Sequence, residues 1–119
     1  MNKDLQIAKR TVQAEIQALK KLSLSFNRSS HFSNAVNLLS KMKGKCLVVG
    51  VGKSYLVSLK VSATLSSLGT PSVAFSANDL QHGGLGAVQK NNDALLIFSV
   101  SGESSELNNI LRYANRHNI

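Results

Sequence analysis

The chain has 119 residues, enough for one domain, and its formal net charge is +8. Its 43% hydrophobic and 17% charged residues are the composition of a folded protein rather than a disordered one. No apolar run approaches the roughly 20 residues of a membrane-spanning helix, and no secretory signal follows the amino terminus, so we expect a cytoplasmic protein that does not bind membranes.

The positive charge is concentrated in the first 45 residues, which carry nine Lys or Arg and two Asp or Glu. The remaining residues carry five Lys or Arg and four Asp or Glu. The basic residues are spread out, without interleaved aromatic residues or the pattern of a nucleic-acid-binding module. We therefore interpret them as a solvated face and expect no specific nucleic-acid partner. The single cysteine, Cys46, excludes an intrachain disulfide and a cysteine-cluster metal site.

Residues 1–44 are expected to form an N-terminal helical part. Between residues 4 and 26, apolar side chains recur at the three- and four-residue spacing of an amphipathic helix. Ser29 and Ser30 offer an N-cap for a second helix, which Gly44 is expected to end.

Residues 45–119 alternate predicted strands and helices. Continuous apolar runs at 46–50, 72–75 and 94–98 are typical of strands buried on both faces of a parallel sheet. A helix is expected between the first two runs, at about 54–68, and another after the third run. The glycine-rich segment 76–92 is expected to be mostly loop. This order predicts an α/β fold with a doubly wound parallel sheet.

Two predicted strand ends carry sequence suited to a phosphate. In open parallel sheets, ligands bind at the carboxyl ends of the strands. The segment Gly50-Val-Gly-Lys-Ser54 lets backbone approach an anion at a helix start and adds a charge on Lys53. The segment Ser99-Val-Ser-Gly-Glu-Ser-Ser-Glu106 offers hydroxyls and further helix-start amides. Both segments therefore resemble anion cradles.

The first segment has other interpretations. A nucleotide P-loop would need a glycine where Leu47 stands, and a dinucleotide fingerprint would need one at Tyr55, so neither template fits. The alternative that these are ordinary strand-to-helix turns stays open for the first segment by itself. Lys53, considered by itself, is also consistent with a solvated lysine at the surface. Glu106, considered by itself, is also consistent with a carboxylate that complements the helix dipole.

The combination of motifs resembles a known family. Gly-Val-Gly-Lys-Ser54 is followed by Gly69-Thr-Pro71, then His82-Gly-Gly-Leu-Gly86, then Ser99-Val-Ser-Gly-Glu-Ser-Ser-Glu106. In order and spacing this is similar to the sugar isomerase (SIS) domain of arabinose-5-phosphate isomerases, over residues about 45–119. Residues 1–44 match the leading helices of that family only loosely.

The resemblance implies an aldose–ketose isomerase that interconverts D-arabinose 5-phosphate and D-ribulose 5-phosphate through an enediol. It implies a flavodoxin-like sheet, no cofactor and no metal, and a homo-oligomer, a tetramer in the family. It assigns catalytic roles to Lys53, Glu106 and His82. It also assigns substrate-binding roles to the following residues: Gly52, Ser54, Ser99, Ser101, Gly102 and Ser104.

The sequence also departs from the family pattern. Tyr55 replaces a glycine after Gly-Lys-Ser, and Gly84 replaces the aspartate of His-Gly-Asp-Leu-Gly. The resemblance implies five parallel strands, of which only three can be identified, so we expect a truncated member that lacks downstream catalytic residues. The alternative function is a non-catalytic sugar-phosphate-binding module or a remnant.

Overall fold

The computed structural model describes residues 2–119, which form two compact units. One extends to Asn37 and the other comprises Leu38–Ile119. Each is described by itself below. The division between a helical part and a sheet part that we placed after residue 44 stays a prediction.

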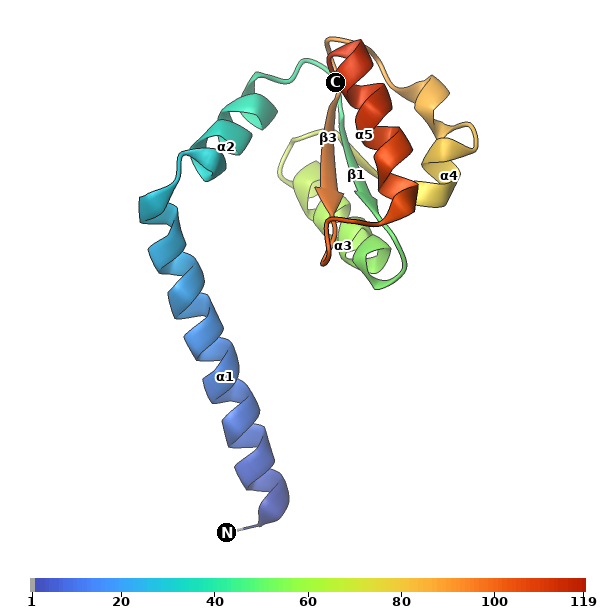
Figure 1. Ribbon diagram of the computed structural model, residues 1–119. Coiled ribbons are helices and arrows are strands. Elements are labelled where there is room, and N and C mark those ends of the chain that lie inside the picture. The colour runs from blue at the N-terminus through green and yellow to red at the C-terminus, as the bar shows by residue number, and fades with distance from the viewer. Residues whose placement is uncertain (1) are drawn as a thin grey trace. The chain divides into compact units, whose positions relative to one another are not determined.

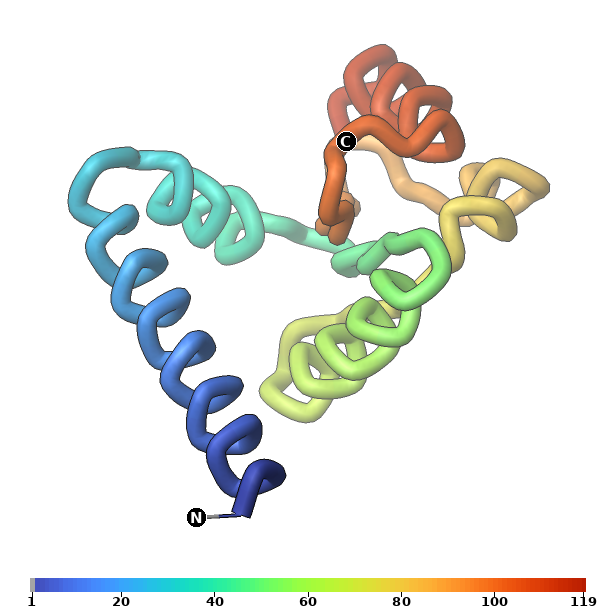
Figure 2. The backbone as a smooth tube through the Cα atoms, turned by 60° about the horizontal axis from the view of Figure 1, so that its bottom comes forward, coloured from blue at the N-terminus to red at the C-terminus, as the bar shows by residue number. Residues whose placement is uncertain are grey.

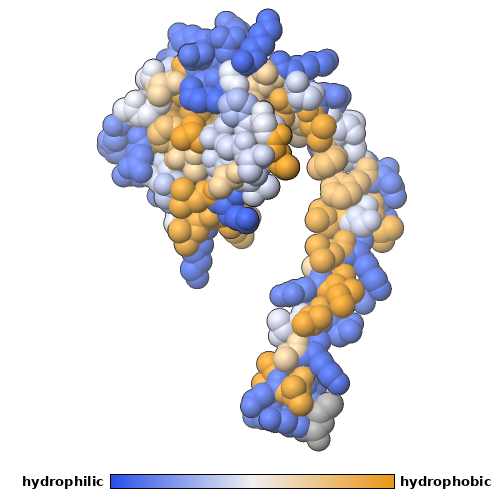
Figure 3. All heavy atoms as spheres, turned by 180° about the vertical axis from the view of Figure 1, so that it is seen from behind, coloured by the Kyte–Doolittle hydropathy of each residue, from blue (hydrophilic) through white to orange (hydrophobic). Residues whose placement is uncertain are grey.

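The first unit is helical (Figure 1). Helix α1 spans Lys3–Ser25, the 3₁₀ turn η1 spans Phe26–Arg28, and α2 spans His31–Lys41 and continues into the second unit. The Asn2 side chain accepts a hydrogen bond from the Asp4 N–H (3.0 Å) and so caps α1. Every residue of α1 is exposed, including the predicted apolar stripe, and orange apolar side chains lie along this unit in Figure 3.

The second unit contains a parallel sheet of three strands, β1 (Cys46–Gly50), β2 (Ser72–Ser76) and β3 (Ala94–Phe98), in the order β2-β1-β3. The central strand β1 is fully buried, as its continuous apolar sequence predicts. Three parallel strands linked through helices confirm the predicted α/β class. Gly50 lies opposite Ser76 on one side and Phe98 on the other, so all three strands end level with one another.

Helices cover both faces of this sheet (Figure 2). Helix α3 (Lys53–Ser67) packs on one face, while α4 (Ala77–Gln81), η2 (Gly84–Ala87) and α5 (Ser105–His117) cover the other. The core lies mainly between the sheet and the second layer. Its buried members come from both layers: Leu47, Val49, Ala77, Leu80, Val88, Leu107 and Ile110.

Helix α4 corrects the expectation that residues 76–92 are mostly loop. The Ser76 hydroxyl accepts a hydrogen bond from the Asp79 N–H (3.1 Å) and donates one to Asp79 Oδ2 (2.6 Å). This Ser-x-x-acid pattern is a helix-start signal that the nearby glycines obscured. The apolar residues Ala77 and Leu80 then anchor the short helix in the core.

A buried carboxylate fixes the amino ends of the strands. Asp93 precedes β3, its side chain is 1% exposed, and it pairs with the Lys45 ammonium at 2.8 Å. It also accepts hydrogen bonds from the Lys45 and Gln89 backbone N–H groups, both at 2.8 Å. Gly44 passes so close that an added Cβ would overlap Asp93 Oδ1. Asp93 thus ties the start of β1 to the loop that leads into β3.

Candidate functional site

The candidate site lies at the carboxyl edge of the sheet, where both cradle segments emerge. Because β1 and β3 are neighbours and end level, residues 51–54 and 99–104 leave the sheet side by side. The segment after β2 leaves at the same edge. This edge carries the motifs that the sequence pointed to.

The first segment turns tightly into α3. Gly52 adopts φ +56°, a conformation that favours glycine, and the helix begins at Lys53. Gly50 leaves no room for a side chain, since an added Cβ would overlap the backbone of Ser54 and Tyr55. The start of α3 therefore lies directly against the end of β1, with the exposed Lys53 in its first turn.

The second segment is organised by its own hydroxyls. The Ser99 hydroxyl accepts a hydrogen bond from the Gly102 N–H (2.9 Å), and the Ser101 hydroxyl accepts one from the Glu103 N–H (3.2 Å). Gly102 has φ +71°. Ser104 is the N-cap residue of α5, although its side chain makes no capping hydrogen bond. These contacts shape a loop with hydroxyl and amide groups along it.

A shallow hollow joins the two segments. About 210 Å³ in volume, it is lined by Ser54 of α3, by Ser99 after β3, and by three apolar side chains: Val57, Phe98 and Val100. Two segments far apart in the sequence thereby face the same space. Ser54 and Ser99 are the two predicted binding residues that the fold most clearly brings together.

Glu106 and His82 are connected through helix α4. Glu106 is exposed in the first turn of α5, and the Ser105 hydroxyl donates a hydrogen bond to its Oε2 (3.3 Å). His82 is exposed and directly follows α4. The Gln81 side-chain amide donates a hydrogen bond to the Glu106 backbone carbonyl. Sequence reasoning did not single out Gln81, because a glutamine beside a histidine forms no recognisable pattern.

Lys53 and Glu106 begin helices on opposite faces of the sheet, but both helices begin at its carboxyl edge. An ammonium and a carboxylate are therefore available at the ends of adjacent strands. Their action on one ligand stays a prediction.

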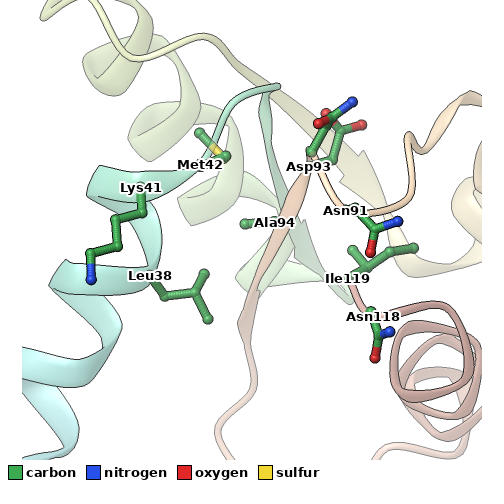
Figure 4. Close-up of a pocket in the computed structure, with 9 residues that line it drawn as sticks. Leu38, Lys41, Met42, Asn91, Asp93, Ala94, Asn118 and Ile119 are labelled. Atoms are coloured by element: carbon green, nitrogen blue, oxygen red, sulfur yellow. The ribbon is translucent and has the colours of Figure 1, made fainter.

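The amino edge of the sheet differs in character. A hollow of about 270 Å³ there is lined by the end of α2, the residues before β3 and the residues after α5, including Lys41, Asn91 and Asn118 (Figure 4). The Asp93 side chain in its lining is already paired with Lys45. Within residues 2–119, no three His, Cys, Asp or Glu side chains gather as a metal site would require. Nor do these residues include a helix long and apolar enough to cross a membrane.

Comparison with known proteins establishes the family. The model of the SIS domain family matches residues 38–119, so this chain belongs to the SIS domain family. This confirms the resemblance drawn from the four motifs.

Individual relatives agree with that assignment. RP505 of Rickettsia prowazekii (strain Madrid E) is 37% identical over 113 residues, covering 95% of this chain and 34% of that protein. The arabinose 5-phosphate isomerase KdsD of Yersinia pestis is 33% identical over 114 residues, covering 96% of this chain and 34% of that protein. The structure of Escherichia coli CFT073 c3406 in complex with arabinose 5-phosphate matches with a TM-score of 0.82 and 30% identity, over 98% of this chain and 62% of that one. The chain spans about a third of the length of these curated relatives.

Proposed function

We propose that the carboxyl-edge site binds a pentose phosphate and that this chain takes part in interconverting D-arabinose 5-phosphate and D-ribulose 5-phosphate. The observation that carries the proposal is the shared hollow of Ser54 and Ser99, which lies between the start of α3 and the residues that follow β3. It is supported by the similar E. coli protein, whose structure was solved in complex with arabinose 5-phosphate.

The proposed chemistry is a proton transfer through an enediol. A base removes the proton from the carbon next to the carbonyl, and the proton returns to the neighbouring carbon while the hydroxyl proton moves between the two oxygens. In this scheme Glu106 is the base and Lys53 stabilises the charge that develops on the oxygen. His82 assists ring opening or positions the sugar.

The phosphate is proposed to lie among the hydroxyls of the two cradle segments. The positive end of the α3 dipole favours an anion at the start of that helix, and Lys53 adds a positive charge there. The hydroxyls that we assign to the phosphate are those of Ser54, Ser99, Ser101 and Ser104. Gly52 and Gly102, both with positive φ, let the backbone turn towards it.

A second candidate is binding without turnover. Lys53, Glu106 and His82 are all exposed to solvent, whereas proton transfer next to a carbonyl usually proceeds in a site that excludes water. A sensor or partner-dependent module would have this arrangement. A homo-oligomer that covers these groups stays a prediction, which light scattering after size-exclusion chromatography would check.

Two measurements on the same samples separate the candidates. Thermal shift with arabinose 5-phosphate, ribulose 5-phosphate and glucosamine 6-phosphate reports binding and its selectivity, and a turnover assay reports isomerisation. We expect stabilisation by the pentose phosphates, and at least roughly a 100-fold loss of turnover in Lys53→Ala and Glu106→Gln. The matched controls are Lys60→Ala in α3 and Glu15→Gln in α1, both at exposed positions.

Stabilisation without turnover would support the binding module instead. If none of the three sugar phosphates shifts the melting temperature, the site is not a sugar-phosphate site. Turnover that survives both Lys53→Ala and Glu106→Gln would remove these residues from the mechanism.

A further inference from the structure

Helix α1 is a long amphipathic helix that buries none of its residues. Orange apolar side chains follow this unit in Figure 3. In folded proteins such helices are stabilised mainly by packing of the apolar face against another surface, so this face requires a partner. Its large members are between 37% and 65% exposed, and together with Ala8 they are called the α1 stripe: Leu5, Ala8, Val12, Ile16, Leu19 and Leu22.

The stripe is part of an internal repeat. The segment Asp4-Leu-Gln-Ile-Ala-Lys-Arg10 returns 11 residues later as Glu15-Ile-Gln-Ala-Leu-Lys-Lys21. Every position keeps its chemical class: an acid, an apolar residue, a glutamine, two apolar residues and two basic residues. Because 11 residues complete almost three turns of an α-helix, both copies of the repeat present each class on the same side of α1. A surface that fits the first copy can therefore fit the second in the same way.

The repeat places opposite charges on the two flanks of the α1 stripe. At about 3.6 residues per turn, Asp4 and Glu15 lie along one flank. Lys9 and Lys20 lie along the other flank, while the last basic residue of each copy lies on the far side of the helix. Charges that flank an apolar seam select the partner helix and its orientation. The arrangement is therefore that of a helix that pairs with another helix.

A second α1 helix in parallel orientation complements these flanks. When two identical parallel helices face each other, the acidic flank of each lies beside the basic flank of the other. Glu15 then approaches Lys20 of the second copy, and Asp4 approaches its Lys9. In an antiparallel pair like flanks meet, and acids face acids. An anionic lipid surface would favour basic residues on both flanks, which the acidic flank of α1 opposes.

We propose that the α1 stripe is a self-association surface through which two copies of this chain pair, with their α1 helices parallel and in register. Each contact between the flanks then occurs twice, because the two copies are related by a twofold axis. The proposal goes beyond the proposed function, since it involves no ligand and no residue of the carboxyl-edge site. Its test therefore succeeds or fails independently of sugar-phosphate binding.

Disulfide cross-linking of cysteine variants of the full chain tests the orientation. In a parallel pair in register, Leu5→Cys meets its own copy within the roughly 4–7 Å between Cα atoms that a disulfide spans. In an antiparallel pair aligned at the helix centres, the same two atoms would lie about 27 Å apart along the axis. We expect Leu5→Cys to form a covalent dimer under mild oxidation. The matched control is the exposed Ala14→Cys on the far side of α1, and the wild type, with its buried Cys46, is the blank.

Charge reversal tests the pairing of the flanks. Lys20→Glu turns an attraction to Glu15 into a repulsion at two symmetry-related places, so the dimer dissociation constant from analytical ultracentrifugation should rise about tenfold or more. Lys21→Glu makes the same change of charge and helix propensity at the neighbouring residue on the far side, and should stay within about twofold of the wild type. The swap Glu15→Lys with Lys20→Glu keeps the net charge and should restore the dissociation constant to within about threefold.

A wild-type chain that stays monomeric at its highest soluble concentration would overturn the proposal. Equal dissociation constants for Lys20→Glu and Lys21→Glu would do the same, as would a swap that fails to restore pairing or a Leu5→Cys variant that forms no cross-link. A monomeric chain that binds vesicles of phosphatidylserine and phosphatidylcholine would identify a lipid surface as the partner of the stripe instead. Circular dichroism of each variant checks that α1 remains helical.

Discussion

The buried Asp93 carboxylate gives the sharpest test of how the sheet unit is stabilised. Replacing Asp93 with Asn keeps its shape, removes its charge and turns an NH₂ group towards donors that need an acceptor. The carboxylate receives three hydrogen bonds of 2.8 Å, two from Lys45 and one from the Gln89 N–H. An asparagine in the same place can satisfy only part of this set.

The expected cost follows from the number of donors left without an acceptor. A hydrogen bond to a charged group contributes roughly 1.5–3 kcal/mol, and a buried donor without a partner costs about as much. The Lys45 side chain is 31% exposed, so water can solvate its ammonium group and limit the loss. We therefore expect Asp93→Asn to lower the free energy of unfolding by about 2–4 kcal/mol at neutral pH.

The effect should depend on pH in a defined direction. Burial alone would raise the pKa of the Asp93 carboxyl, but the hydrogen bonds from Gln89 and Lys45 and the charge of Lys45 outweigh it and lower this pKa. A lowered pKa in the folded state adds stability above the unfolded pKa, about 3.9, and this stability is lost as the pH falls through the folded value. The difference between wild type and Asp93→Asn should thus be constant above about pH 5 and shrink below about pH 4.

Urea unfolding followed by circular dichroism at about pH 7, 5 and 3 measures this difference. The matched control is Asp79→Asn, whose carboxylate is exposed and whose hydrogen bond from Ser76 an asparagine oxygen can still accept. It should change the free energy of unfolding by less than about 1 kcal/mol. A stability for Asp93→Asn equal to wild type at neutral pH, or a difference that grows in acid, would refute this account.

Two further predictions concern the strand β1. Gly50→Ala should destabilise the fold by about 1–3 kcal/mol in the same urea titration, because the new methyl group overlaps the start of α3. The control Gly86→Ala, with no atom within 4 Å of the added Cβ, should cost less than about 1 kcal/mol. Equal costs for the two substitutions would contradict the close approach of β1 and α3. Burial raises the pKa of the Cys46 thiol. Iodoacetamide at about pH 8 should therefore modify Cys46 much more slowly in the folded chain than in the urea-unfolded chain. Equal rates would show that β1 is accessible to the reagent.

Much of the fold could be predicted from local sequence. The runs 46–50 and 94–98 are strands with the predicted bounds, because five consecutive apolar residues between turn signals are typical of a strand buried on both faces. The Ser76–Asp79 pattern is a local helix-start signal for α4, but the glycine-rich residues that follow it favour a loop.

The candidate site could be predicted only in part. Gly52, Lys53 and Glu106 lie at helix starts, as their motifs indicated, because such positions are set by nearby residues. The shared hollow of Ser54 and Ser99 depends on which strands are neighbours, and sequence order alone does not state that β1 lies between β2 and β3. The link from Gln81 to Glu106 is likewise a tertiary contact with no signature in the sequence.

The sequence by itself determined where the three strands and the longer helices lie, since these depend on residues close together in the chain. Only the tertiary structure decided which side of α3 is buried. In α3 the leucines Leu56 and Leu59 are exposed, while Ser58 and Ser62 face the sheet. The helix lies so close to β1 that only small side chains fit between them, and that closeness is set by the packing of distant segments.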